Sequence, residues 1–277
     1  MSAPGIERTV VGDFGAADDL LWKAVAGNLA SYGPLCIARS GRIGPLVEMA
    51  LARRLHREPY ASIEIAPPFV RMVDDALTNG AISGAGQNDV GGVFPLVRHD
   101  PATKDWALWD QWAKHAENAA VSAGLPRRFA EGILGALGEL QDNVYLHSAR
   151  PETGIAAYAV AKGSFEFVVA DQGIGVLASL RQNPEFASIA DAGTALRLAA
   201  SDGASRLGAA SGHGYGIGQL FRALAQHHGE LRFRSDDHAL TLSGNAPSLG
   251  GQVEIAQKAR LPGLVISVRC TARPEGN

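Results

Sequence analysis

Residues 127–148, RRFAEGILGALGELQDNVYLHS, are the stretch that decides the class of fold. Their apolar side chains recur every three to four positions, which is typical of a helix that buries one stripe. The stripe comprises Phe129, Ile133, Leu134, Leu137 and Leu140. Glu139 and Asn143 are four residues apart and His147 follows one turn later, so these polar side chains share one face. Such a face is either solvated or part of a site, and the rest of the chain has to decide between the two.

Two β-like runs follow this helix, at residues 154–162 and 164–170. The second run ends at Asp171, which Gly173 and Gly175 follow. A carboxylate therefore lies at the end of an apolar strand, beside a backbone that a ligand can approach closely because glycine has no side chain. A plain turn has the same composition, so both interpretations stay open at this point.

A second glycine cluster, GHGYGIG, begins at residue 212, after a long segment at 176–211. It precedes a stretch that we expect to be helical up to His228. Free backbone N–H groups at the positive end of a helix favour a phosphate site, whereas the alternative is a flexible loop. The residues concerned are Gly212, His213, Gly214, Gly216 and Gly218, of which His213 could also contact a phosphate.

The rest of the chain reads as four strand-like segments, ELRFRS, LTLSG, QVEIAQ and GLVISVR. Helices followed by antiparallel-looking strands indicate an α/β sandwich, in which a mixed sheet packs on helices, rather than a doubly wound sheet. We expect this domain to span residues 125–277.

The first third of the chain alternates short strands and helices. Apolar patterning predicts strands at 34–38 and 60–65 and helices at 43–57 and 67–79. A β-α-β-α order usually builds a parallel sheet with crossover helices. The glycine-rich residues 80–92 are typical of a loop or linker. We therefore expect a smaller N-terminal α/β domain at residues 1–100.

Residues 101–124 are expected to form a connecting helix between the two domains. Trp106, Trp109 and Trp112 recur along it at every third position. Aromatic stripes at helical spacing usually pack in a core or an interface, so we expect these rings to pack against the neighbouring domain.

Composition excludes several classes of function. The 277 residues are 46% hydrophobic and 19% charged, which is typical of globular domains rather than of disorder. A net charge of −3 offers no basic surface for nucleic acid. We expect neither a membrane span nor export, because the apolar runs are too short and the start lacks the pattern of a secretory signal. Only Cys36 and Cys270 are present, which fits a reducing compartment, so we expect a cytoplasmic protein.

Three sequence motifs that occur in a fixed order identify a protein family more specifically than any one of them does. E-x-x-x-N on a helix, D-x-G-x-G after two strands, and alternating glycines before a second helix resemble the GHKL superfamily of gyrase, heat-shock chaperone, histidine kinase and mismatch-repair ATPases. GELQDNVYLHS is most similar to the helix of bacterial anti-sigma-factor serine kinases and related ATP-binding regulators. The resemblance covers roughly residues 125–270, and the first 100 residues are similar to STAS-type domains.

The resemblance implies a site for ATP and Mg²⁺. Asn143 matches the asparagine that coordinates the ion, and Asp171 matches the aspartate that accepts a hydrogen bond from the adenine amino group. Gly173 and Gly175 leave room for the base. Glu139 matches the glutamate that activates water or a serine hydroxyl. The amides of the second glycine cluster match those that meet the phosphates, with residues 176–211 as the lid.

These roles imply a regulatory protein of signal transduction that either phosphorylates a serine or threonine of a partner or hydrolyses ATP. Its partner would be a protein regulator or a phosphorylation target, and a homodimer is compatible with both. No segment resembles the histidine-bearing dimerisation helix of sensor kinases. The family often has threonine after the glycine of the late strand, where this chain has Leu264, so one contact near the base is in doubt.

Two other hypotheses remain open. ATP could act only as a gate for protein binding, without turnover, because Glu139 permits catalysis and does not prove it. A dinucleotide-binding oxidoreductase would use VVADQGIGVLA as strand and G-x-G-x-x-A. That hypothesis needs an acidic residue at the end of a following strand, but the region around Asp191 reads as helix. It also gives Glu139, Asn143 and the second glycine cluster no role. The phosphate loop G-x-x-x-x-G-K-[ST] is excluded, because no lysine follows a glycine.

Overall fold

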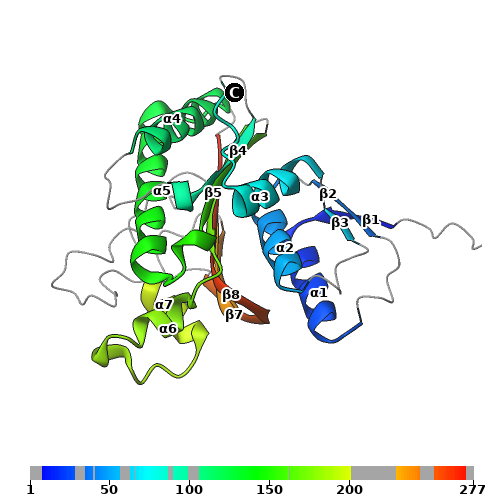
Figure 1. Ribbon diagram of the computed structural model, residues 1–277, viewed down its shortest axis with the longest axis vertical. Coiled ribbons are helices and arrows are strands. Elements are labelled where there is room, and N and C mark those ends of the chain that lie inside the picture. The colour runs from blue at the N-terminus through cyan, green and yellow to red at the C-terminus, as the bar shows by residue number, and fades with distance from the viewer. Residues whose placement is uncertain are drawn as a thin grey trace, which may run out of the picture.

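Two sheets and two layers of helices make up the computed structural model. It describes residues 8–28, 35–39, 41–56, 63–65, 67–86, 90–98, 106–161, 163–200, 229–243 and 253–272. In Figure 1 the larger sheet is seen nearly edge-on, with α1–α3 and the small sheet on one side and α4–α7 on the other. The chain therefore stacks in the order small sheet, helices, large sheet, helices.

The small sheet and its helices form what we call the N-terminal unit. Its elements are β1 (Arg8–Gly12), α1 (Phe14–Val25), β2 (Leu35–Arg39), α2 (Gly44–Leu55), β3 (Ile63–Ile65) and α3 (Pro67–Asn79). The strands pair in parallel in the order β1-β2-β3, which confirms the parallel sheet with crossover helices. Apolar patterning did not reveal β1 and α1. The start of α1 has a local cause, because Asp13 caps it by accepting a hydrogen bond from the Ala16 N–H at 2.8 Å.

The large sheet has the order β4-β5-β6-β8-β7. Its strands are β4 (Gly91–Pro95), β5 (Ile155–Ala161), β6 (Ser164–Asp171), β7 (Glu230–Ser243) and β8 (Val253–Thr271). All four pairings between these described strands are antiparallel, so the expected mixed sheet is wrong for this part of the chain. The tight turn at Gly163, with φ +71°, reverses the chain between β5 and β6 and excludes a parallel pairing there.

The four strand-like segments at the end of the chain merge into two long strands. β7 and β8 pair along most of their length, with register shifts on either side of Asp236. Asp236 has φ +52°, a left-handed conformation that is uncommon for a residue with a side chain. Such an irregularity bends a strand without ending it, which is why the interruption in the apolar pattern does not mark a turn.

Strand β4 brings residues before position 100 into the large sheet. Ser83 and Val93 exchange backbone hydrogen bonds, and a Cβ on Gly84 would lie 2.2 Å from Gly92 Cα. Residues 80–86 form neither helix nor strand, as expected for a loop, and they pack closely on the start of β4, which takes in Gly91 and Gly92 at the end of the glycine-rich stretch. The large sheet thus begins before the expected domain boundary.

Helices cover the other side of the large sheet. They are α4 (Ala107–Ser122), α5 (Arg127–His147), α6 (Gly175–Leu180) and α7 (Ala192–Ala200), with short 3₁₀ turns η2 (Leu96–Arg98), η3 (Pro151–Thr153) and η4 (Pro184–Phe186). The long amphipathic helix predicted at 127–148 is confirmed as α5. Of its apolar stripe, Phe129, Ile133, Leu137 and Leu140 are buried and Leu134 is half-buried.

Helix α4 confirms the predicted connecting helix, and two of its tryptophans pack on the large sheet. Trp109 lies 5.3 Å from Phe94 between ring centroids, and Trp112 lies 5.3 Å from Tyr158. Both aromatic partners belong to the large sheet, most of which lies in the domain expected at residues 125–277, so these rings pack against the neighbouring domain as predicted. Trp106 remains 39% exposed.

The large sheet is buried on both faces, and successive residues of β6 alternate between them. Val168 and Ala170 pack with α1–α3, whereas Phe167 and Val169 pack with α4 and α5. The same alternation places Asp171, the last residue of β6, on the side of α5. Across the described ranges, no helix combines the length and the apolar character needed to pass through a bilayer.

Candidate functional site

Asp171 is a buried carboxylate at the end of β6, with only 2% of its surface exposed. The Gly173 N–H donates a hydrogen bond to its Oδ1 at 2.7 Å. Burial raises the pKa of Asp171 from 3.8 to about 7, and the hydrogen bond from Gly173 opposes this rise. Gly173 is the one donor recorded for this carboxylate within the described part of the chain. The remaining acceptor positions can therefore take a hydrogen bond from a ligand.

The loop after Asp171 lies directly on the end of α5. The Ile174 N–H donates to the carbonyl oxygen of Ser148 at 2.9 Å. A Cβ on Gly173 would lie 2.1 Å from the same oxygen, so only glycine fits this approach. The structure thus joins the D-x-G-x-G loop to the helix that carries Glu139 and Asn143.

A second close approach comes from β8. A Cβ on Gly263, which has φ +89°, would lie 2.1 Å from the carbonyl oxygen of Asp171. The buried hydroxyl of Ser235 links this strand to the loop. It donates to the Gly263 carbonyl oxygen at 2.8 Å and accepts from the Val176 N–H at 2.9 Å. Nothing in the sequence pointed to Ser235, because a lone serine in a strand carries no signal of such a role.

Gln172, the residue after Asp171, was also missed. Its backbone N–H donates to Thr153 Oγ1 at 2.9 Å, and its side-chain Nε2 donates to the carbonyl oxygen of Leu51 in α2 at 3.2 Å. The loop that positions Asp171 therefore also contacts the N-terminal unit.

The polar face of α5 is confirmed in part as a solvated face. Glu139 is exposed, whereas Asn143 and His147 are half-buried. His147 Nδ1 lies 3.5 Å from Ser179 Oγ in α6, so the C-terminal end of this face adjoins the helix that follows the loop. Within the described residues, no group of three His, Cys, Asp or Glu side chains could hold a metal ion.

The first part of the expected lid is folded. Residues 175–200 form α6, η4 and α7, and α7 packs on β7. Asp191 accepts a hydrogen bond from the Thr194 N–H at 2.8 Å, which caps α7. Residues 201–211 lie outside the described residues, and so do Gly212, His213, Gly214, Gly216 and Gly218.

The antiparallel neighbours of β6 bear on the oxidoreductase hypothesis. A dinucleotide fingerprint requires a parallel β-α-β unit, but β6 runs antiparallel to both β5 and β8. The glycines after Asp171 therefore do not form that motif.

Compared with models of known protein families, with curated proteins and with solved structures, the chain gave no match.

Replacing Gly173 by alanine is expected to lower the free energy of unfolding by about 1 to 3 kcal/mol, the usual cost of overpacking. The new Cβ would meet the Ser148 carbonyl, which cannot move without displacing the end of α5. Urea denaturation followed by circular dichroism measures the change. Gly132→Ala is the matched control, because a Cβ there meets nothing within 4 Å, and it should stabilise α5 by up to about 1 kcal/mol. A Gly173→Ala protein as stable as the parent would mean that the loop does not rest on α5.

Proposed function

We propose that the chain binds ATP with Mg²⁺ in a GHKL-type site formed by α5 and the loop at residues 171–175. The observation that carries the proposal is the buried Asp171 carboxylate, which has one recorded backbone donor and lies beside two closely approached glycines. A buried carboxylate without sufficient donors is costly, and a ligand N–H group would relieve that cost. The amino group of adenine is such a donor.

The metal would be held mainly by the phosphates and by Asn143. Mg²⁺ in nucleotide sites commonly uses one or two protein oxygens and otherwise phosphate and water oxygens. A cluster of acidic ligands is therefore not required. Asn143 is half-buried and lies one turn before His147, on the side of α5 that adjoins α6. The glycines from 212 to 218 would add backbone N–H groups for the phosphates.

Glu139 would act on the attacking oxygen. It lies one turn before Asn143 and is exposed, so a hydroxyl of a docked protein or a water molecule can reach it. We therefore propose a cytoplasmic bacterial regulator that phosphorylates a serine or threonine of a partner or hydrolyses ATP. The same exposure fits a solvated helix residue, which favours an ATP-gated binding module as the second candidate.

Asp171→Asn is expected to weaken binding of a non-hydrolysable ATP analogue with Mg²⁺ by roughly tenfold or more. Loss of a charge-assisted hydrogen bond costs about 1.5 to 3 kcal/mol. The asparagine oxygen can still accept from the Gly173 N–H, so the loop should keep its shape. Isothermal calorimetry measures the affinity. Glu131→Gln removes one carboxylate charge from an exposed position of α5 and should leave the affinity unchanged.

The pH dependence gives the same test a second readout. An ionised carboxylate accepts a hydrogen bond from the adenine amino group more strongly than a neutral carboxyl does. The free Asp171 carboxyl, with a pKa of about 7, is largely protonated below that pH. The parent's affinity should fall from pH 8 to pH 6, and that of Asp171→Asn should not. The free energy of unfolding changes with pH in the opposite direction to the affinity. The pKa of Asp171 is higher in the folded protein than the unfolded value of 3.8, so the stability that the neutral carboxyl contributes is lost as the pH rises through 7. Equal affinity and equal pH profiles in both proteins would refute the assignment.

A further inference from the structure

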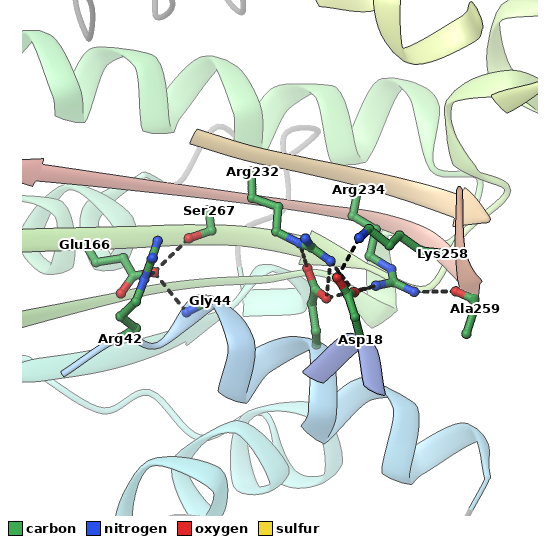
Figure 2. A network of polar contacts seen from close by, with 10 residues as sticks. Asp18, Arg42, Gly44, Glu166, Arg232, Arg234, Lys258, Ala259 and Ser267 are labelled. Carbon is green, nitrogen blue, oxygen red and sulfur yellow. Dashed lines mark hydrogen bonds and ion pairs between the residues drawn. The ribbon is translucent and has the colours of Figure 1, made fainter. Parts of the chain in front are cut away.

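A buried network of charges joins α1 and α2 to β7 and β8 (Figure 2). Arg232 Nε donates to Glu48 Oε1 at 2.7 Å, and Arg232 Nη2 donates to Asp18 Oδ1 at 2.5 Å. Arg234 Nη1 donates to Asp18 Oδ1 at 2.9 Å and to Glu48 Oε2 at 3.1 Å. Lys258 Nζ lies 2.9 Å from Asp18 Oδ2. Two acidic side chains of the N-terminal unit thus meet three basic side chains of the large sheet.

The network fixes the unit in one position on the sheet. Glu48 and Arg234 are fully buried, and Arg232 is 4% exposed. Burial acts against the Asp18 carboxylate, but the attraction of Arg232 and the hydrogen bonds from Lys258 and Arg232 outweigh it and lower the pKa of Asp18. A small displacement would leave several buried charges unpaired. Docked and undocked states are therefore favoured over intermediate ones.

Strand β7 connects this network to the candidate site. Arg234 and Ser235 are consecutive, so their side chains lie on opposite faces of the sheet. Arg234 contacts Asp18 and Glu48 on the face of the N-terminal unit. On the other face, Ser235 holds the loop after Asp171 through its two hydrogen bonds to β8 and to the start of α6. One peptide bond separates the charge network from the clamp on the candidate site.

Helix α2 makes the second connection, because it is held at both ends along β6. Near its start, the N–H groups of Ile43 and Gly44 donate to Glu166 at 2.7 and 3.1 Å. Near its end, the Leu51 carbonyl accepts from the side chain of Gln172, which adjoins Asp171. A shift of α2 on the sheet would break a contact of the loop itself.

We infer that docking of the N-terminal unit and occupancy of the nucleotide site are coupled. Undocking would release Arg234 and Gln172, loosen the clamp at Ser235 and weaken nucleotide binding. By reciprocity, bound nucleotide tightens the docking of α1 and α2. The inference rests on the proposed function for the ligand. It makes the N-terminal unit a control element, because any partner that binds its undocked form turns the site off.

The test compares two carboxylates of the network with a third carboxylate of the N-terminal unit that lies outside it. Asp18→Asn removes one charge of the network, and Glu48→Gln is a second variant at its centre. Asp74→Asn is the control, because Asp74 pairs with Arg53 between α2 and α3, within the unit. Calorimetry with adenylyl imidodiphosphate and Mg²⁺ gives the affinity, and hydrogen exchange of α1 and α2 reports docking. Both network variants should exchange faster and bind roughly five-fold more weakly or worse, whereas Asp74→Asn should bind within about twofold of the parent. Nucleotide should slow exchange in the parent.

The outcomes separate this inference from the proposed function. If the network variants exchange faster but bind nucleotide as tightly as the parent, the coupling is overturned. The proposed function still stands in that case, provided that the parent binds nucleotide and the Asp171→Asn variant does not. Unchanged exchange in both network variants also overturns the inference, because the network then does not hold the unit. If the parent does not bind the nucleotide at all, both the proposed function and the coupling are overturned.

Discussion

Replacing Glu48 by alanine is expected to lower the free energy of unfolding by about 3 to 5 kcal/mol, the cost of removing one partner from a buried ion pair. Glu48 has no exposed surface and accepts hydrogen bonds from Arg232 and Arg234. Its loss would leave two buried guanidinium groups with Asp18 as the shared carboxylate. Urea denaturation monitored by circular dichroism measures this change.

The control for this prediction is Glu64→Ala. Glu64 lies on β3 of the same unit, but its side chain is exposed, so the stability should change by no more than about 0.5 kcal/mol. A loss below about 1 kcal/mol in Glu48→Ala would mean that water reaches the arginines once the carboxylate is gone. The N-terminal unit would then be only loosely docked on the sheet.

Glu139→Ala is expected to reduce turnover by about 10² to 10⁴, the usual contribution of a general base, while the protein binds ATP nearly as well as the parent. Asn143→Ala should instead weaken Mg²⁺-dependent binding of the triphosphate. Both side chains lie on one face of α5, but they would serve different steps. The measurement uses labelled ATP and Mg²⁺ with and without cell extract, and follows the label to protein or to free phosphate.

Glu131→Ala is the matched control for turnover, because Glu131 is exposed on α5 two turns before Glu139. It should retain the full rate. A Glu139→Ala protein with full turnover would show that the base has been misassigned. If the parent transfers no label with any extract, the ATP-gated binding module becomes the better hypothesis, and Glu139 is a solvated helix residue.

Local patterns in the sequence were sufficient for the elements whose apolar residues recur at helical spacing or form a short continuous run. The 3.6-residue period of the apolar positions predicted α5, and short apolar runs predicted β5, β6 and the strands β2 and β3. The position of Asp171 at a strand end followed from the same pattern. These features depend on neighbours in the chain, because residues a few positions apart in the sequence share one face of a helix or strand.

Pattern alone did not reveal elements whose limits depend on distant partners. β4 begins at the end of a glycine-rich stretch, and it is a strand because β5 pairs with it. β7 continues through the irregularity at Asp236 because β8 pairs with it on both sides. In each case the hydrogen bonds that define the strand come from another part of the chain, so no local signal marks them.

The sequence by itself determined the helix with its polar face, the carboxylate and glycines at the end of β6, and the parallel order of the N-terminal unit. Only the tertiary structure decided that this unit covers one face of the large sheet and that Ser235 and Gln172 hold the loop of the candidate site. The contact between Arg232 and Glu48 joins residues 184 positions apart. Isolated charges at such a separation carry no pattern, because their energy depends on burial and distance, which exist only once the chain has folded.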